Sequence, residues 1–384
     1  MPFTGKATYS AGSTLPEIAD DVSDIVSIVS PYETPLLDHL GDPARAATST
    51  YHEWLEDSLM PNRDTINDPS MSNSTEKTVI TVSNGPRFRP GDQVRPHGAS
   101  EIMYVTGVMS NDIVVTRGYG GTTKATLANG QLLHIVGNAA LEGDDAPIVR
   151  FTNRVRKGNW TQIFTAAVRV SGSDQAVRKL AVSDELDYQK QERLRELLRD
   201  LESTVLCGRA PAANPEGSST VRRAMNGILS AVQTNVFAPG VGGFPADTDL
   251  TETQLNLAMR NIWESSNAHV DTIVVNGFQK RKINGFIAAS ARHIAGSETT
   301  YRDMVSVYES DFGVCRIILA RSMPADCVLL LDSSRVNVMP LIGRSFHFKP
   351  LTTLGDYEAG EVIGEYTVEV RNEIAHGLIK GLDS

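Results

Sequence analysis

A long amphipathic helix, predicted over residues 184–207, is the feature that most constrains how this chain folds. Ser183 is a suitable N-cap, and the acidic Asp184 and Glu185 lie at the positive end of the helix dipole. Gly208 is a suitable residue to end the helix. Apolar residues recur every three or four positions and form one stripe: Leu194, Leu197, Leu198, Leu201 and Val205. We expect this to be the longest element of the chain.

The first sixty residues have the composition of an arm rather than of a domain. They are rich in Ser, Thr, Asp and Pro, with one short apolar-periodic piece at residues 18–29. The stretch SPYETPLLDHLG follows, and its prolines Pro31 and Pro35 oppose a continuous helix. Because this segment has too little apolar surface for a core of its own, we expect it to pack on something else.

Residues 79–141 predict a compact all-β module. Asn-Gly, Pro-Gly, Asn-Asp and Gly-Gly turn signals separate its short β-rich runs. Such a module is easily inserted in a loop, since its two ends can lie close together. Another β-rich run covers residues 150–174, with positive charge concentrated at its start.

From about residue 220 onward, helices and strands alternate. Thr251 and Gln254 form a capping-box pattern before an apolar helical segment. The runs DTIVVN, VCRIILA and CVLLLD are nearly continuously apolar, which predicts central strands covered on both faces. GEVIGEYTVEVRN alternates more and predicts a strand with one exposed side.

Charge is distributed in blocks along the chain. Residues 1–60 carry ten acidic and two basic residues, a net charge of −8, whereas residues 61–182 carry ten acidic and fourteen basic residues, net +4. These blocks are either solvated faces or an acidic segment of one copy that meets a basic segment of another. With a total of −10, the chain is a poor sequence-independent binder of nucleic acid.

Size and composition indicate a globular protein of two or three domains. The chain has 384 residues, 41% apolar and 21% charged, and no stretch approaches the ~20 apolar residues of a membrane span. The N-terminus lacks the apolar core of a signal peptide. The odd set of cysteines, without metal-like spacing, favours a reducing cytoplasm over a disulfide framework: Cys207, Cys315 and Cys327. We expect no metal and no cofactor.

The glycine-rich stretch RGYGGTTKAT, residues 117–126, is the most motif-like piece of the chain. Backbone N–H groups of such a turn can hold phosphates, so a phosphate- or nucleotide-handling enzyme using the Gly118–Lys124 loop is one hypothesis. The glycines do not have Walker A or dinucleotide-binding spacing, and no helical pattern follows. The favoured interpretation is a tight turn needing unusual φ values, with Arg117 and Lys124 as surface or inter-subunit contacts.

Other catalytic patterns are incomplete. HEWLE, residues 52–56, has Glu56 where a zinc-protease helix carries its second histidine, so an exposed or interface segment anchored by Trp54 is the better interpretation. No GxSxG nucleophile elbow occurs, and the eight histidines are scattered singly. An enzyme hypothesis therefore has no named catalytic residues.

Several stretches occur in an order that resembles tailed-bacteriophage major capsid proteins: SPYETPLLDHLG, EWLEDSL, NWTQIF, RVSGSDQAVR, DELDYQKQERLRELLRDLE and RRAMNGIL. The similarity is greatest to the branch that carries a β-insertion in its extended loop, and it covers most of the chain. Its motifs are diffuse packing signatures rather than catalytic fingerprints. The resemblance implies an α+β fold of the Hong Kong 97 type and a structural protein that is not an enzyme.

The resemblance also implies a division of the chain into the parts of that fold. An N-terminal arm is expected at residues 1–50, and an extended loop at 51–84 and 142–182, with an inserted β-domain at 85–141. The remainder is expected to form a peripheral domain at 183–250 and 336–384, with spine helix 184–207, and an axial domain at 251–335.

The function that the resemblance implies is self-assembly, as hexamers and pentamers, into the icosahedral head that encloses the double-stranded DNA of a tailed bacteriophage. The head is part of the virion and is assembled in the host bacterial cytoplasm. Expected partners are a portal, packaged DNA without sequence-specific binding and, as an optional partner, a decoration protein; no membrane is expected. Because no charged coiled-coil-like segment precedes Ser30, a separate scaffolding protein is expected.

Charge then suggests how neighbouring subunits meet. A basic extended loop is expected to lie over acids of a neighbour's arm or spine helix. The residues expected at subunit contacts are Asp20, Asp21, Asp24, Pro31, Tyr32, Trp54, Arg150, Arg154, Arg156, Lys157, Asp184 and Glu185. Two alternatives stay open besides the enzyme: an encapsulin-like nanocompartment shell, and a β-module at 79–141 that binds carbohydrate or a cell surface.

Overall fold

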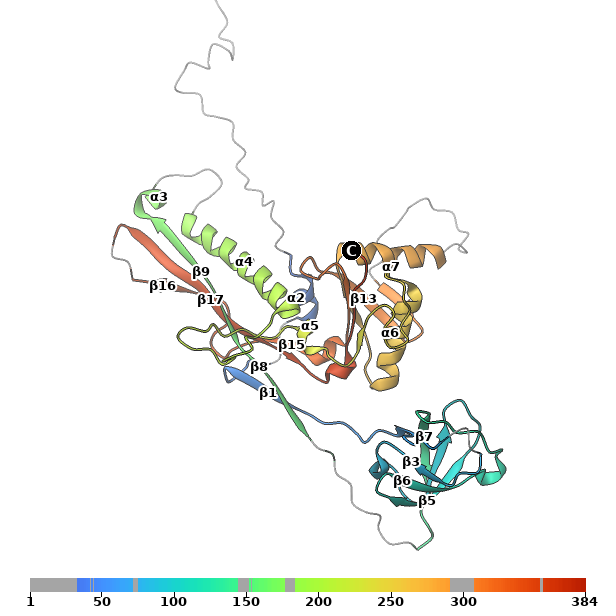
Figure 1. Ribbon diagram of the computed structural model, residues 1–384. Helices are drawn as coiled ribbons and strands as arrows, with labels where there is room; N and C mark the ends of the chain where they lie inside the picture. The colour runs from blue at the N-terminus through green and yellow to red at the C-terminus, as the bar shows by residue number, and fades with distance from the viewer. Residues whose placement is uncertain are drawn as a thin grey trace, which may run out of the picture. The chain divides into compact units, whose positions relative to one another are not determined.

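The computed structural model describes residues 33–41, 43, 45–71, 75–143, 152, 154–176, 184–290, 307–352 and 355–384. The chain divides into two compact units, Leu55–Val155 and the combination of Met1–Trp54 with Arg156–Ser384. Each unit has its own sheets (Figure 1). Each also has its own apolar core.

Helix α4, Glu185–Cys207, is the long helix that the sequence predicted, and it lies along a four-stranded sheet (Figure 1). Leu197, Leu201 and Val205 of its stripe are buried against that sheet. Within the sheet, the long central strand pairs with one strand along one edge and with two shorter strands along the other. The strands are β9 (Gln162–Ser171), β15 (Val336–Pro340), β16 (His347–Leu351) and the central β17 (Tyr357–Val370).

The start of α4 differs from the prediction by one residue. Asp184, not Ser183, is the N-cap, and its side chain accepts hydrogen bonds from the N–H groups of Leu186 and Asp187. A carboxylate caps a helix more favourably than a hydroxyl at the positive end of the dipole. Gly208 ends the helix as predicted, but with φ of −54°. Glycine is needed there because a Cβ would lie 2.5 Å from the Thr204 carbonyl oxygen.

The stretch SPYETPLLDHLG contains a short helix, α2 (Pro35–Leu40), which begins at its second proline. The missing N–H of Pro35 costs nothing at this position. Leu36 is fully buried in the same core as the α4 stripe. The buried Glu202 carboxylate of α4 accepts hydrogen bonds from Leu36 N at 3.1 Å and Leu37 N at 3.4 Å. Helix α2 is thus fixed to α4 by apolar packing and by hydrogen bonds to its first turn.

A six-stranded sheet forms the other half of this unit, in the order β10-β18-β14-β11-β13-β12. The runs predicted as central strands are its neighbours β14, β11 and β13, and β14 and β11 are buried throughout. Val314 and Leu319 of β13 are exposed, because only the short edge strand β12 lies beyond this strand. The prediction that both faces of the strand are covered is therefore wrong for β13. The bounds are β10 Val236–Phe237, β11 Thr272–Val275, β12 Val307–Ser310, β13 Gly313–Leu319, β14 Cys327–Leu331 and β18 Gly377–Lys380.

Alternate side chains of this sheet enter two apolar cores. Val274 points into the core that contains the α4 stripe, whereas Ile273 and Val275 point into a second core formed with α6 and α7. The predicted capping box of Thr251 and Gln254 is present at the start of α6. The helices are α3 (Gly172–Ala176), α5 (Ile228–Ala231), α6 (Glu252–Ser265) and α7 (Gly277–Ser290), with 3-10 turns η4 (Ser333–Arg335) and η5 (Glu373–Ala375). Among the described residues, none of the helices has the length and apolarity needed to cross a bilayer.

Strands β10 and β18 lie outside the boundaries expected for an axial domain at 251–335. Strand β18 pairs with β14 on one side and with β10 on the other, so this sheet draws on residues before 251 and near the C-terminus. The reason is the open edge of β14, whose backbone groups need a partner that residues 251–335 do not supply.

The second unit, Leu55–Val155, contains a six-stranded antiparallel sheet in the order β2-β7-β4-β5-β6-β3 around its own apolar core. Two of its strands precede residue 85, so the unit is larger than the expected insertion at 85–141. The elements are β2 Arg63–Thr65, β3 Val79–Thr81, η1 Gly85–Arg87, β4 Asp92–Pro96, β5 Met103–Met109, β6 Asp112–Thr116, η2 Tyr119–Gly121 and β7 Leu132–Asn138. Strands β1 (Tyr51–Glu56) and β8 (Val155–Trp160) form a separate two-stranded sheet where the chain leaves and re-enters the first unit.

We predict that Glu202→Gln flattens the pH dependence of stability. Burial raises the pKa of Glu202 to about 7, against the opposing hydrogen bonds from Leu37 and Leu36. Between the ordinary value of 4.5 and about 7, the folded chain therefore binds more protons than the unfolded chain, and the free energy of unfolding falls as pH rises. The loss approaches about 3 kcal/mol. Thermal midpoints at about pH 5 and about pH 8 measure it.

The matched control is Glu196→Gln on the same helix. Glu196 is partly exposed and pairs with Arg193, so its neutralisation should leave the pH slope of the wild type intact. If Glu202→Gln keeps the full slope as well, the buried carboxyl is not its source.

Candidate functional site

The base of the β1–β8 sheet is fixed by one buried amide, Asn159. Its Nδ2 donates to the carbonyl oxygens of Val368 and Asn226, each at 2.9 Å, and its Oδ1 accepts from Asn226 N at 2.9 Å. Strand β8, strand β17 and the segment before α5 therefore meet at one side chain. The backbone N–H and carbonyl groups of Asn226 are both hydrogen-bonded to the Asn159 side chain, which fixes the relative position of these three segments.

Two buried carboxylates of β17 lie beside this junction. Glu365 accepts a hydrogen bond from Thr161 Oγ1 at 2.6 Å and pairs with Arg223. Arg223 in turn donates to the Thr161 carbonyl at 2.8 Å, and Arg344 Nε lies 2.8 Å from the second carboxylate oxygen. The buried Glu365 carboxylate is thus paired with two arginines whose side chains are partly exposed.

Glu369, four residues further along β17, binds groups of the N-terminal segments. His52 Nε2 of β1 lies 2.7 Å from its Oε2, and Arg45 and Arg371 lie at 3.4 and 3.1 Å. Glu365, Thr367 and Glu369 share one side of β17, and all three are buried. The sequence predicted one exposed side for this strand. That prediction is wrong for the C-terminal half of β17, where the base of the β1–β8 sheet covers this side.

Past this anchor, the β1–β8 sheet becomes exposed. Leu55 and Val155 are 63% and 51% exposed, and Arg154, Arg156 and Lys157 are exposed around them. Arg156 lies 3.6 Å from Glu53 on the facing strand and remains largely in solvent. Among the described residues, these apolar and basic side chains are thus exposed along the two-stranded sheet.

The other expected contact residues are divided between described and undescribed segments. Trp54 is half-buried, with its ring 5.9 Å from that of His52. Asp184 is the α4 cap, and Glu185 accepts a hydrogen bond from Gln189 at 2.8 Å. The remaining expected contacts lie outside the described residues: Asp20, Asp21, Asp24, Pro31, Tyr32 and Arg150.

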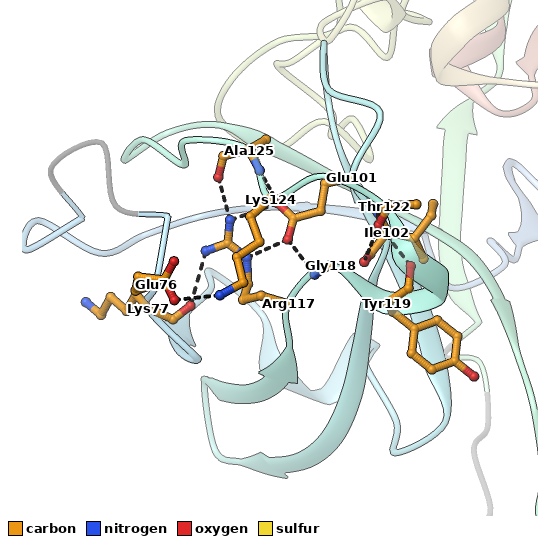
Figure 2. Close-up of polar contacts among 10 residues, drawn as sticks. All are labelled: Glu76, Lys77, Glu101, Ile102, Arg117, Gly118, Tyr119, Thr122, Lys124 and Ala125. Carbon is orange, nitrogen blue, oxygen red and sulfur yellow. Dashed lines mark hydrogen bonds and ion pairs between the residues drawn. The ribbon is translucent and has the colours of Figure 1, made fainter.

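The glycine-rich stretch of the second unit encloses a carboxylate of the chain itself. Figure 2 shows Glu101 at its centre, held by Arg117 Nε at 2.7 Å and Nη2 at 2.8 Å. Glu101 also accepts hydrogen bonds from Gly118 N at 3.0 Å and Ala125 N at 2.7 Å. These are the kinds of groups that hold a phosphate in a phosphate-binding loop, and here an internal carboxylate occupies them.

Two expectations for this stretch can now be judged. The positive φ values of Gly118, Gly120 and Gly121 confirm a turn that needs glycine. The expectation that Arg117 is a surface residue is wrong: its side chain is 2% exposed, because the Glu101 carboxylate and two carbonyl oxygens surround it. Lys124, the other candidate phosphate ligand, pairs with Glu76 (Figure 2).

Burial acts to raise the pKa of Glu101, but the hydrogen bonds from Arg117, Ala125 N and Gly118 N outweigh it and hold the pKa below its usual range. The charged form is therefore the one that the fold requires. The Gly118–Lys124 loop is part of a structural ion-pair cluster, in which Glu101 occupies the Arg117 guanidinium and the N–H groups of Gly118 and Ala125.

Comparison with known proteins decides the family. The family model of the SU10 major capsid protein matches residues 3–383. The chain belongs to this family. Among curated proteins none matches. The capsid protein matches solved structures from Gordonia phage Cozz at a TM-score of 0.51 and 11% identity, covering 100% of this chain and 97% of that one. Structures from Mycobacterium phage Bobi and Microbacterium phage Oxtober96 match at 0.50 and 13% identity, covering 99% and 98% of this chain and 100% and 99% of theirs.

These comparisons establish the main expectations from the sequence. The protein is a major capsid protein of a tailed phage, with the mixed α and β fold of the Hong Kong 97 type, and its role is structural. Self-assembly into icosahedral shells is the property of its capsid homologues. The family match favours a phage capsid over an encapsulin-like shell.

We predict that Glu101→Gln destabilises the second unit by about 3–5 kcal/mol, because it leaves the buried Arg117 guanidinium without a counter-charge. Urea unfolding of the purified protein measures the change. The control is Glu76→Gln, whose partner Lys124 is 41% exposed, and its cost should be about 0–1 kcal/mol. Equal costs for the two variants would contradict a structural role for the Glu101–Arg117 pair.

Proposed function

We propose that this capsid protein forms the icosahedral head of a tailed phage from hexamers and pentamers, with the exposed part of the β1–β8 sheet of one copy lying over an acidic surface of the next. The observation that supports this is the exposed cluster of Leu55, Val155, Arg154, Arg156 and Lys157. Exposed apolar side chains among charges mark surfaces that a partner covers.

The rigid base and the exposed end of this sheet have different roles. Asn159, Glu365 and Glu369 fix the base to β17, so the position of the exposed end is set before a neighbour arrives. A pre-organised segment loses less conformational entropy on association than a free one. We assign the β1–β8 sheet and the segments next to it to the extended loop, α4 and the β17 sheet to the peripheral domain, and the six-stranded sheet with α6 and α7 to the axial domain.

The remaining parts of the proposal concern partners and place. The head encloses double-stranded DNA without sequence-specific contacts, in keeping with a net charge of −10. A separate scaffolding protein and a portal take part in assembly, which occurs in the host bacterial cytoplasm, and a decoration protein is an optional partner. The expected arm contacts Asp20, Asp21 and Asp24, with Pro31, Tyr32 and Arg150, belong to the same proposal.

Electron microscopy of the purified protein tests the function directly. We expect shells or capsomers, with assembly weakened as salt is raised, because exposed ion pairs are screened. The double variant Arg154→Glu with Arg156→Glu should require at least about tenfold more protein for assembly, since about 1 kcal/mol of attraction per pair becomes repulsion. Its circular dichroism spectrum and thermal midpoint should stay near those of the wild type.

The control is Arg260→Glu with Lys349→Glu, which changes the net charge equally at two exposed cations that pair with Glu264 and Glu361. It should assemble at a lower protein concentration than the double variant of the β1–β8 sheet. If the Arg154→Glu with Arg156→Glu variant assembles normally across a range of salt, the electrostatic part of the proposal is wrong. If the wild-type protein stays a dilute monomer that never associates, the whole proposal is wrong.

A further inference from the structure

Three basic side chains stand in register across the sheet of the second unit. Arg63 of β2 lies opposite His134 of β7, and His134 lies opposite Arg95 of β4. Directly opposite residues of antiparallel strands point to the same face, with Cβ atoms about 5 Å apart. The adjacent positions in the three strands are buried in the core: Asp64, Leu133, Val94 and Pro96. Arg63, His134 and Arg95, the basic row, therefore face away from that core.

His97 extends the basic row. It is exposed, and its Nδ1 lies 3.3 Å from His134 Nε2, with ring centroids 5.6 Å apart. The contact brings a second imidazole onto the same face as the two guanidinium groups. The result is a surface with four potential cations gathered within three neighbouring strands.

The other cations of the unit are used differently. Five of them lie beside a carboxylate of the same unit: Lys77 with Asp68, Arg87 with Asp64, Arg89 with Asp92, Arg117 with Glu101 and Lys124 with Glu76. Within the part of the chain that the structure describes, neither Arg63 nor Arg95 has a carboxylate within ion-pair distance. These two guanidinium groups of the basic row therefore differ from the five cations that the unit pairs internally.

This arrangement carries a cost in the isolated unit. Arg63 and Arg95 lie on either side of His134, two strands apart, so their charges repel one another weakly. An exposed sheet position accepts many polar residues that avoid such repulsion. A neighbouring anion would reverse the sign of the interaction, and guanidinium groups in line match carboxylates well in both charge and geometry. The row therefore has the features of a surface that meets an acidic partner.

We propose that the basic row binds carboxylates on a second copy of this chain, an inference that rests on the proposed shell. The unit Leu55–Val155 carries eleven acidic and nine basic residues, net −2, so the rest of each copy holds −8 of the total of −10. The acidic surplus of a neighbouring copy can thus supply a counter-charge to Arg63 and Arg95. In a shell, every copy meets such neighbours, and each contact is repeated throughout.

Zero-length cross-linking identifies the partner. The variants Arg63→Lys and Arg95→Lys keep the positive charge and supply an amine that a carbodiimide joins to any carboxylate in contact. Shells assembled from equal amounts of ¹⁴N- and ¹⁵N-labelled protein are cross-linked, digested and analysed by mass spectrometry. We expect mixed-isotope peptides that join residue 63 or residue 95 to an Asp or Glu of another copy. The internal control is the native Lys124–Glu76 pair, which should give same-isotope peptides only.

The outcomes separate this inference from the proposed function. The inference is wrong if assembled shells contain the Lys124–Glu76 cross-link but residues 63 and 95 form no cross-link, or form cross-links only within one copy. Binding of an added anionic polysaccharide by the row in such shells would point to another class of partner and would equally count against it. If no shells form under any condition, the proposed function itself fails.

A second measurement uses neutral side chains. Arg63→Gln with Arg95→Gln should raise the protein concentration needed for assembly about fivefold, as expected for the loss of exposed ion pairs. Arg89→Gln with Lys124→Gln changes the net charge by the same amount in the same unit, but these cations already pair within it. The control pair should leave the assembly concentration within about twofold of the wild type. Equal shifts for both pairs would show a net-charge effect and overturn the inference.

Discussion

Buried carboxylates that bind distant parts of the chain are the constraint on which this structure depends. An ionised carboxylate away from water is tolerated only when hydrogen-bond donors and cations surround it in a defined geometry. Each such group therefore excludes packings in which its partners are displaced, whatever apolar area those packings bury. The ionised carboxylates and their partners are Glu101 with Arg117, Glu365 with Thr161 and Arg223, and Glu369 with His52 and Arg45.

The consequence is greatest along β17. This strand carries Glu365 and Glu369 on one side, and their partners come from the N-terminal segments, from β1 and from the loop before α5. Apolar packing alone would allow a strand to slip by two residues without exposing its hydrophobic side. A slip of two would carry both carboxylates away from Thr161 and His52. The polar side of β17 thus fixes the register that its apolar side leaves open.

The sequence predicted the parts whose signals are local. The α4 stripe, the capping box at Thr251 and the turn glycines near Gly118 follow from spacing within a few residues, and the structure has them. The buried polar sites were missed because their partners are far away in sequence, as with Glu202 and Leu36. An acidic residue within an apolar alternating run, as in TVEV, also fits a solvated side of a strand, so the sequence did not show that these carboxylates are buried. Their partners could not be predicted either, since pairing depends on tertiary structure.

In the proposed assembly, neighbouring copies meet through a second class of charge, which differs from the first in its surroundings. A buried pair such as Glu101 with Arg117 is little screened by salt, so it stabilises the fold over a wide range of salt concentrations. An exposed cation such as Arg156 contributes little in one contact and is screened by salt. Weak contacts of this kind can form, break and form again until a closed shell uses all of them, whereas buried pairs between copies would trap misplaced subunits. The separation of internal strong pairs from external weak ones is therefore what a shell of identical copies requires: subunits that are rigid before they meet, and contacts that can be corrected after they meet.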